Sequence, residues 1–123
     1  MDMNSFETGP VVNEVIVAWL NGNAGKRLLQ LPVEIHASAL GIESSYLGVG
    51  PKKIELRLDT NALSIDLPMH LLPFCPAYPC RVWLQGTWGP LIPDQSEKGL
   101  PVFAVKKVVD IAGPDATHVR MAK

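Results

Sequence analysis

Prolines and glycines interrupt this chain so often that long helices have little room. Eleven prolines and ten glycines occur within 123 residues. A proline inside a helix removes a hydrogen-bond donor and clashes with the preceding turn, and both residue types favour chain reversals. Valine, isoleucine and leucine dominate between these breaks, and glutamate, lysine and alanine never gather into a helix-favouring block. The sequence therefore predicts short strands joined by turns.

The chain length fits a single domain. We expect a flexible N-terminal tail over residues 1–10, one β-barrel domain over 11–112 and a flexible C-terminal tail over 113–123. No run of about 18 apolar residues occurs, so no membrane-spanning helix is expected. The first ten residues lack the basic-then-apolar pattern of a secretory signal. The cytoplasm is the expected location.

Alternation of apolar and polar residues predicts the strands. It is clearest over residues 53–59, and residues 63–67 repeat it after a three-residue turn. These two runs are predicted to form a β-hairpin with one buried face. Further strands are predicted over residues 11–20, 26–38, 81–88 and 101–111.

Turn-forming residues mark the predicted connections. Asn21–Gly25 has the composition of a hairpin turn, and Gly41–Pro51 and Gly89–Gly99 are predicted loops. Pro32 restricts its strand to an edge or a bulge. Pro68–Pro79 contains four prolines, so at most one helical turn fits there, over residues 68–72.

The order of the predicted elements resembles the oligonucleotide/oligosaccharide-binding (OB) fold. Its last third, Arg81–Trp88 followed by a polar loop and Val102–Val109, is similar to the closing strands of OB domains, in which a glycine such as Gly86 permits a sharp bend. The resemblance covers residues 11–111. It implies an all-β fold, a small five-stranded barrel, closed or partly open, with a short Pro-rich or one-turn helical link before the fourth strand. A β-sandwich or another small barrel is the alternative.

The formal net charge of −1 argues against a dedicated phosphate binder. Any nucleic-acid interface must therefore rest on a local patch. Trp83 and Arg81 lie on the strand face opposite Val82 and Leu84, where an exposed indole could stack on a base. In the alternative interpretation, a loop or a partner subunit buries Trp83. The candidate nucleic-acid-binding residues are Trp83, Arg81, Arg57, Lys53, Trp88, Phe103, Lys106 and Lys107.

Metal binding and catalysis find little support in the sequence. Cys75, Cys80 and His70 could supply three zinc ligands, with the fourth from His36, His118 or a carboxylate. Ordinary thiols are the favoured interpretation, and a disulfide is geometrically possible although nothing indicates an oxidising compartment. Phosphate-binding loops, nucleophile elbows and paired-histidine motifs are absent from the sequence. We expect no enzyme activity, metal or cofactor.

Two functions remain open at this point. The first is a non-enzymatic module that binds single-stranded DNA or RNA through the aromatic and basic sheet face. The second is a protein-interaction or homo-oligomerisation domain within a larger assembly. The dependence of affinity on salt concentration distinguishes the two functions. Phosphate binding weakens steeply as ionic strength rises, and binding through an apolar interface does not.

Overall fold

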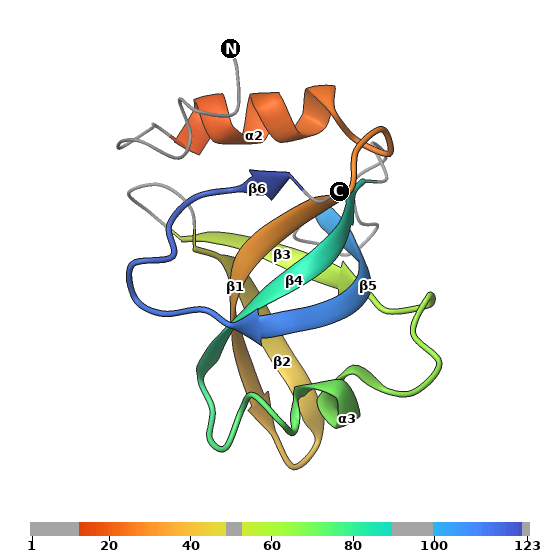
Figure 1. Cartoon of the computed structure of the whole chain (residues 1–123), viewed down its shortest axis with the longest axis vertical. Coiled ribbons are helices and arrows are strands. Elements are labelled where there is room, and N and C mark those ends of the chain that lie inside the picture. Colours follow the sequence, from red (N-terminus) through yellow and green to blue (C-terminus); the bar gives the residue numbers. More distant parts are fainter. Residues whose placement is uncertain (1–12, 49–52, 90–99, 122–123) are drawn as a thin grey trace.

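The computed structural model describes residues 13–48, 53–89 and 100–121 (Figure 1). Strands dominate, as the sequence predicts. In chain order the elements are α2 (Asn13–Gly22), β1 (Leu29–Ser38), β2 (Gly41–Leu47), β3 (Ile54–Asp59), α3 (Leu67–Leu71), β4 (Cys80–Trp88), β5 (Val102–Ile111) and β6 (Arg120–Met121).

Five of the strands close into a barrel. β1 pairs antiparallel with both β2 and β4, β2 pairs antiparallel with β3, and β4 pairs antiparallel with β5. A parallel pairing of β3 with β5 completes the circuit, and β6 adds to the first two residues of β1. The predicted five-stranded barrel is thus confirmed, and its strand order is compatible with an OB-like architecture.

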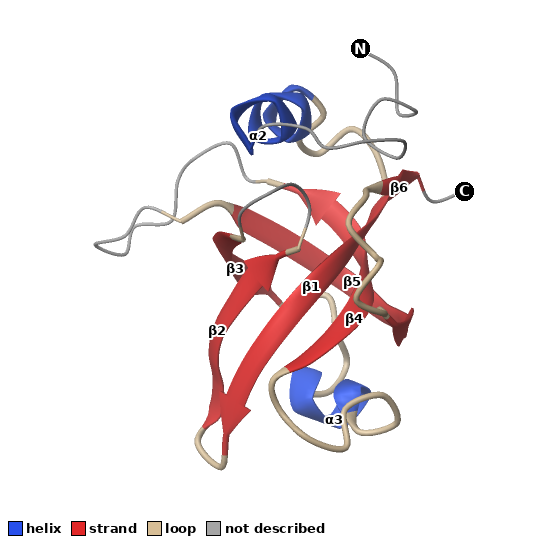
Figure 2. Ribbon diagram, turned by 90° about the vertical axis from the view of Figure 1, so that its left-hand side faces the viewer, coloured by secondary structure: helices blue, strands red, loops and turns tan. Residues whose placement is uncertain are grey.

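The barrel interior is filled by aliphatic and aromatic side chains from every barrel strand. Leu31, Val33 and Ile35 of β1 show the alternation, since all three are buried and share one face. The two helices lie at opposite ends of the barrel (Figures 1 and 2). Both helices contribute buried residues to this core, and each fully buried aliphatic side chain is worth about 1.5–3 kcal/mol.

Several local predictions are confirmed. β1, β3, β4 and β5 fall within the strands predicted over residues 26–38, 53–59, 81–88 and 101–111, give or take one residue. The single helical turn is α3, with a proline in its first turn.

Pro32 lies within β1, where its carbonyl accepts a hydrogen bond of 2.9 Å from the amide of Gly48. The N and O atoms of one strand residue face the same neighbour. The nitrogen of Pro32 therefore faces the end of β2, where the ladder of β1 with β2 starts one residue later, at Val33. The prediction of an edge or bulge position is wrong, because β1 pairs with β2 and β4 on its two sides and its bulge lies at His36–Ala37.

The prediction of a strand over residues 11–20 is wrong, because this region contributes to helix α2. Ile16 and Leu20, four residues apart, are both fully buried, whereas Ala18 between them is exposed. That spacing is helical. Asn21–Gly25 consequently forms the end of α2 and the turn after it, and not a hairpin turn.

The predicted hairpin of residues 53–59 with 63–67 is also wrong. β3 instead pairs with β2 on one edge, at Ile54–Leu56, and in parallel with β5 on the other, at Arg57–Asp59. Ile65 instead faces solvent, and Leu67 enters the core as the first residue of α3. Nonlocal parallel pairing has overridden the local alternation.

Two predicted irregular segments are ordered. Residues 41–47 of the predicted loop Gly41–Pro51 form β2, with Gly41 at φ 117° directly after the turn from β1. The predicted C-terminal tail packs on the barrel through its fully buried Val119 and through β6. Residues 1–10 and 90–99, predicted as a tail and most of a loop, lie outside the described residues.

Neither α2 nor α3 approaches the length of apolar helix that a bilayer crossing requires, and the described part of the chain holds no other candidate.

Candidate functional site

The ladder between β2 and β3 is short. It joins Ser45 to Leu56, Tyr46 to Glu55 and Leu47 to Ile54. Residues 41–44 of β2 and 57–59 of β3 lie beyond it, and the opposite edge of residues 57–59 pairs with β5. The two strands thus meet at one end and diverge from there (Figure 1).

A β-bulge accompanies this divergence. Ile42 pairs with Ala37 and Ser44 pairs with His36, so Glu43 is an additional residue without a partner on β1. A bulge of this kind bends its strand and increases the local twist. At the end of the ladder the buried Ser45 Oγ donates to the carbonyl of Leu56 at 2.8 Å. Its hydroxyl is thereby satisfied inside the barrel wall.

A groove of about 790 Å³ opens where β2 and β3 separate. Residues 41–45 of β2 form one wall and residues 55–58 of β3 the other, and Thr60, residues 66–68 and Leu100 complete the lining. This volume falls in the range of about 300–1,000 Å³ that is typical of ligand sites. We call this feature the β2–β3 groove.

The charged residues of the β2–β3 groove are mainly acidic. Among the described residues, Glu43, Glu55 and Asp66 line it, and Arg57 is the one cation that does so. Asp66 directly precedes α3, yet its side chain makes no capping hydrogen bond to that helix. The rest of the lining includes aliphatic residues of β2, β3 and α3. The groove therefore offers negative charge beside an apolar surface.

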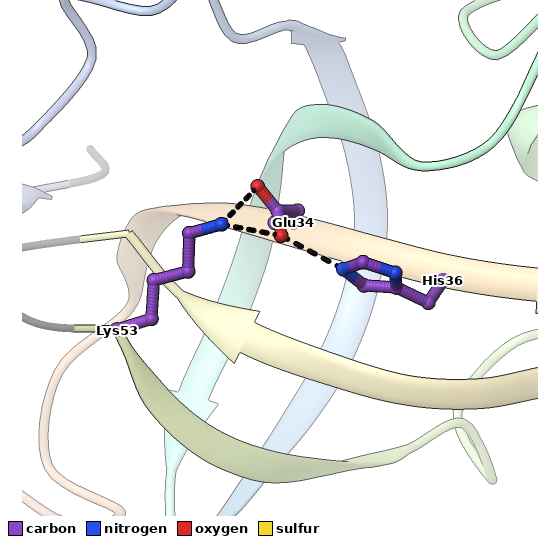
Figure 3. A network of polar contacts seen from close by, with 3 residues as sticks. All are labelled: Glu34, His36 and Lys53. Atoms are coloured by element: carbon purple, nitrogen blue, oxygen red, sulfur yellow. Dashed lines mark hydrogen bonds and ion pairs between the residues drawn. The ribbon is translucent and has the colours of Figure 1, made fainter.

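A polar network joins two residues of β1 to Lys53, the residue before β3 (Figure 3). Lys53 Nζ donates to both carboxylate oxygens of Glu34, at 2.9 and 2.8 Å, and His36 Nε2 lies 2.8 Å from Glu34 Oε2. The Lys53 ammonium lowers the pKa of Glu34 below its ordinary value of 4.5; partial burial opposes this shift and the contact with His36 supports it. The His36 ring also meets the edge of Tyr46, with centroids 5.4 Å apart.

Replacing Lys53 with methionine is expected to make folding stability less sensitive to acid. Because the folded-state pKa of Glu34 is lowered, the ion pair stabilises the fold above pH 4.5 and loses that contribution as pH falls through the folded-state pKa. Lys53 is largely exposed, so the effect at pH 7 is below about 1 kcal/mol. Urea unfolding of both proteins at pH 7 and pH 3 measures it, and an equal stability difference at the two values would contradict this account.

The structure buries the aromatic residues of the predicted binding face. Trp83 is only 3% exposed, because residues 112–121 cover the outer face of β4. Arg120 Cζ lies 3.8 Å from the centre of its ring, and the ring of His118 packs beside it. The expected exposure of Trp83 is wrong, and burial beneath a loop is what the structure shows.

The other candidate residues do not gather in one place. Arg81 donates to the carbonyls of Gly113 at 3.0 Å and Ala116 at 2.6 Å, which fixes the segment over Trp83. Phe103 is in the barrel core, as is Trp88, whose Nε1 donates to Oδ1 of Asn21, in the last turn of α2, at 2.8 Å.

The basic candidates are more accessible. Lys106 and Lys107 are exposed on β5, Lys53 is paired with Glu34, and Arg57 lines the groove. A nucleic-acid role for any of these residues stays a prediction. Among the groove residues, sequence reasoning missed Glu43 and Asp66, because no local pattern marks the point at which two strands separate.

The two cysteines form a disulfide, with Cα atoms 5.8 Å apart. It joins the segment after α3 to the first residue of β4. The favoured interpretation as ordinary thiols is therefore wrong. The described residues contain no group of three or more histidine, cysteine, aspartate or glutamate side chains arranged to hold a metal ion.

Comparison of the chain with protein-family models, with curated protein sequences and with solved structures finds no match.

Proposed function

We propose that this domain is a non-enzymatic binding module of OB type that holds a polypeptide segment in the β2–β3 groove. The observation that carries the proposal is the acidic and apolar lining of that groove. A segment combining basic and apolar side chains is complementary to it in charge and in hydrophobicity. The barrel supports the proposal as well, because OB domains bind their ligands on the face of their second and third strands.

Single-stranded nucleic acid is the second candidate. An OB-type barrel and the position of Arg57 in the groove favour it. However, a phosphate backbone would meet Glu43 and Asp66 there, and bases would find Trp83, Trp88 and Phe103 buried. Charge and aromatic burial therefore favour a polypeptide over a polyanion.

The compartment also belongs to this proposal. The sequence favours the cytoplasm, whereas the disulfide between Cys75 and Cys80 supports an oxidising compartment, since stable disulfides are rare in the cytosol. We propose that the protein resides in an oxidising compartment. Mass spectrometry of alkylated protein purified from its source would show blocked thiols if the pair is reduced there, and this outcome would restore the cytoplasm.

Three labelled probes test the ligand class by fluorescence anisotropy. They are an eight-residue peptide of alternating lysine and valine, the same peptide with glutamate in place of lysine, and oligothymidine. The lysine–valine peptide is expected to bind saturably and the other two to bind at least tenfold more weakly. Preferential binding of oligothymidine would support nucleic acid instead. Light scattering is also measured on the protein without a probe. Association in that sample would identify a second copy of the chain as the partner.

Neutralising the two exposed groove carboxylates is expected to weaken binding of the lysine–valine peptide about three- to tenfold at low salt. The variant is Glu43→Gln with Asp66→Asn, and each lost charge pair is worth about 0.2–1 kcal/mol. The matched control is Asp110→Asn with Asp115→Asn, which removes the same charge at exposed positions outside the groove. An equal loss in both variants would mean that overall charge, and not the groove, attracts the peptide.

A further inference from the structure

We infer that the bound segment adds to the barrel as an extra β-strand along residues 41–44 of β2. This inference rests on the proposed function and specifies the binding mode of the same groove. It concerns the backbone of β2, whereas the proposed function rests on side-chain charge. The two can therefore fail separately.

The open edge of β2 is the first observation. On one side, β2 pairs with β1 along its whole length, from Gly41 to Leu47, apart from the bulged Glu43. On the other side, the ladder with β3 reaches only from Leu47 to Ser45. Within the described residues, 41–44 thus have no ladder partner on that side. Such an edge is a template for an incoming strand, whose main chain supplies the hydrogen bonds.

β3 does not close this edge. Arg57–Asp59 would be the next residues to pair with β2, but the ladder of β3 with β2 ends at Leu56. The opposite edge of Arg57–Asp59 pairs with β5. The amide of Arg57 accordingly donates to the carbonyl of Pro101, at 2.8 Å, which immediately precedes β5. β3 therefore forms the far wall of the groove, opposite the unpaired residues of β2.

The side chains around the open edge suit an alternating segment. An added strand would direct every second side chain towards the barrel interior and the others outwards. Ile42, Leu58 and Leu67 line the groove and also pack in or against the core. They would contact the inward-facing side chains of the added strand. Glu43 and Asp66 are exposed and meet the outward set. Residues 41–44 span about 13 Å at about 3.3 Å per residue, so four to six residues of the segment would pair.

N-methylated forms of the lysine–valine peptide test this mode. In a strand, side chains and backbone N–H groups both alternate with a period of two residues. Methylation of every valine nitrogen therefore blocks one edge of the peptide, and methylation of every lysine nitrogen blocks the other. We expect one form to lose at least tenfold in affinity and the other to stay within about threefold of the parent.

Amide hydrogen exchange in the complex gives a second readout. Alternate amides within residues 42–44 should exchange at least tenfold more slowly when the parent peptide is bound. The amide of Arg57, already bonded to Pro101, is the internal control and should not change. Unchanged exchange at 42–44, or equal affinity of both methylated forms, would overturn strand addition and leave the proposed function standing. If the parent peptide does not bind, both proposals fall.

Discussion

Replacing Gly86 with alanine is expected to lower the free energy of unfolding by about 3 kcal/mol. A Cβ atom at this position would overlap the carbonyl oxygen of Ala104 on β5 and lie 2.9 Å from its carbonyl carbon and 3.2 Å from Phe103 Cζ. Two of these atoms belong to the backbone of the neighbouring strand, so relief requires β4 and β5 to move apart. Overpacking a core usually costs about 1–3 kcal/mol, and a backbone clash lies at the upper end.

Gly113→Ala is the matched control for this variant. A Cβ at Gly113 meets nothing within 4 Å, so this change should leave stability within about 0.5 kcal/mol of the original. Urea unfolding followed by tryptophan fluorescence measures both proteins. A Gly86→Ala protein as stable as the control would show that the close contact of β4 with β5 does not exist in solution.

Replacing Trp83 with alanine is expected to cost about 3–5 kcal/mol, the usual range for removing a buried tryptophan. Trp83 packs against Ala112 and Ala116 and beneath Arg120. Its loss would leave residues 112–121 without their main contact on β4. Urea unfolding gives the stability change, and amide exchange within residues 112–121 should accelerate more than exchange in β1.

Trp83→Phe is the control for the loss of buried aromatic surface. It retains an aromatic ring, so it should lower the free energy of unfolding clearly less than Trp83→Ala does. An unchanged stability of Trp83→Ala would bear on function. If Trp83→Ala keeps full stability but abolishes binding of oligothymidine, Trp83 is an accessible stacking platform, and the sequence-based interpretation of this residue is correct.

Much of the fold follows from local sequence patterns. The alternation of residues 53–59 and the apolar residues of 81–88 and 101–111 each mark a strand, and Pro68 marks the start of a short helix. The strand predictions fail where the local pattern of apolar residues does not decide which partner a segment has. Residues 63–67 alternate like a strand, but the partners of β3 are β2 on one edge and β5, distant in sequence, on the other.

The candidate site was less predictable than the fold. Arg57 was recognised as a surface cation, and it does line the groove. Glu43 was assigned to a loop and Asp66 to a solvated hairpin face. Their proximity depends on where the β2–β3 ladder ends and on the bulge at Glu43. Both are properties of strand register, which the composition of either segment does not encode.

The most direct test of the groove as a binding site is a chemical-shift titration of ¹⁵N-labelled protein with the lysine–valine peptide. We expect saturable shifts concentrated at the amides of residues 41–45 and 55–58, with little change at Lys106 and Lys107 on β5. Shifts centred on β5 and around Trp83, with the β2–β3 groove unaffected, would overturn the proposed function and place the binding surface on β4 and β5.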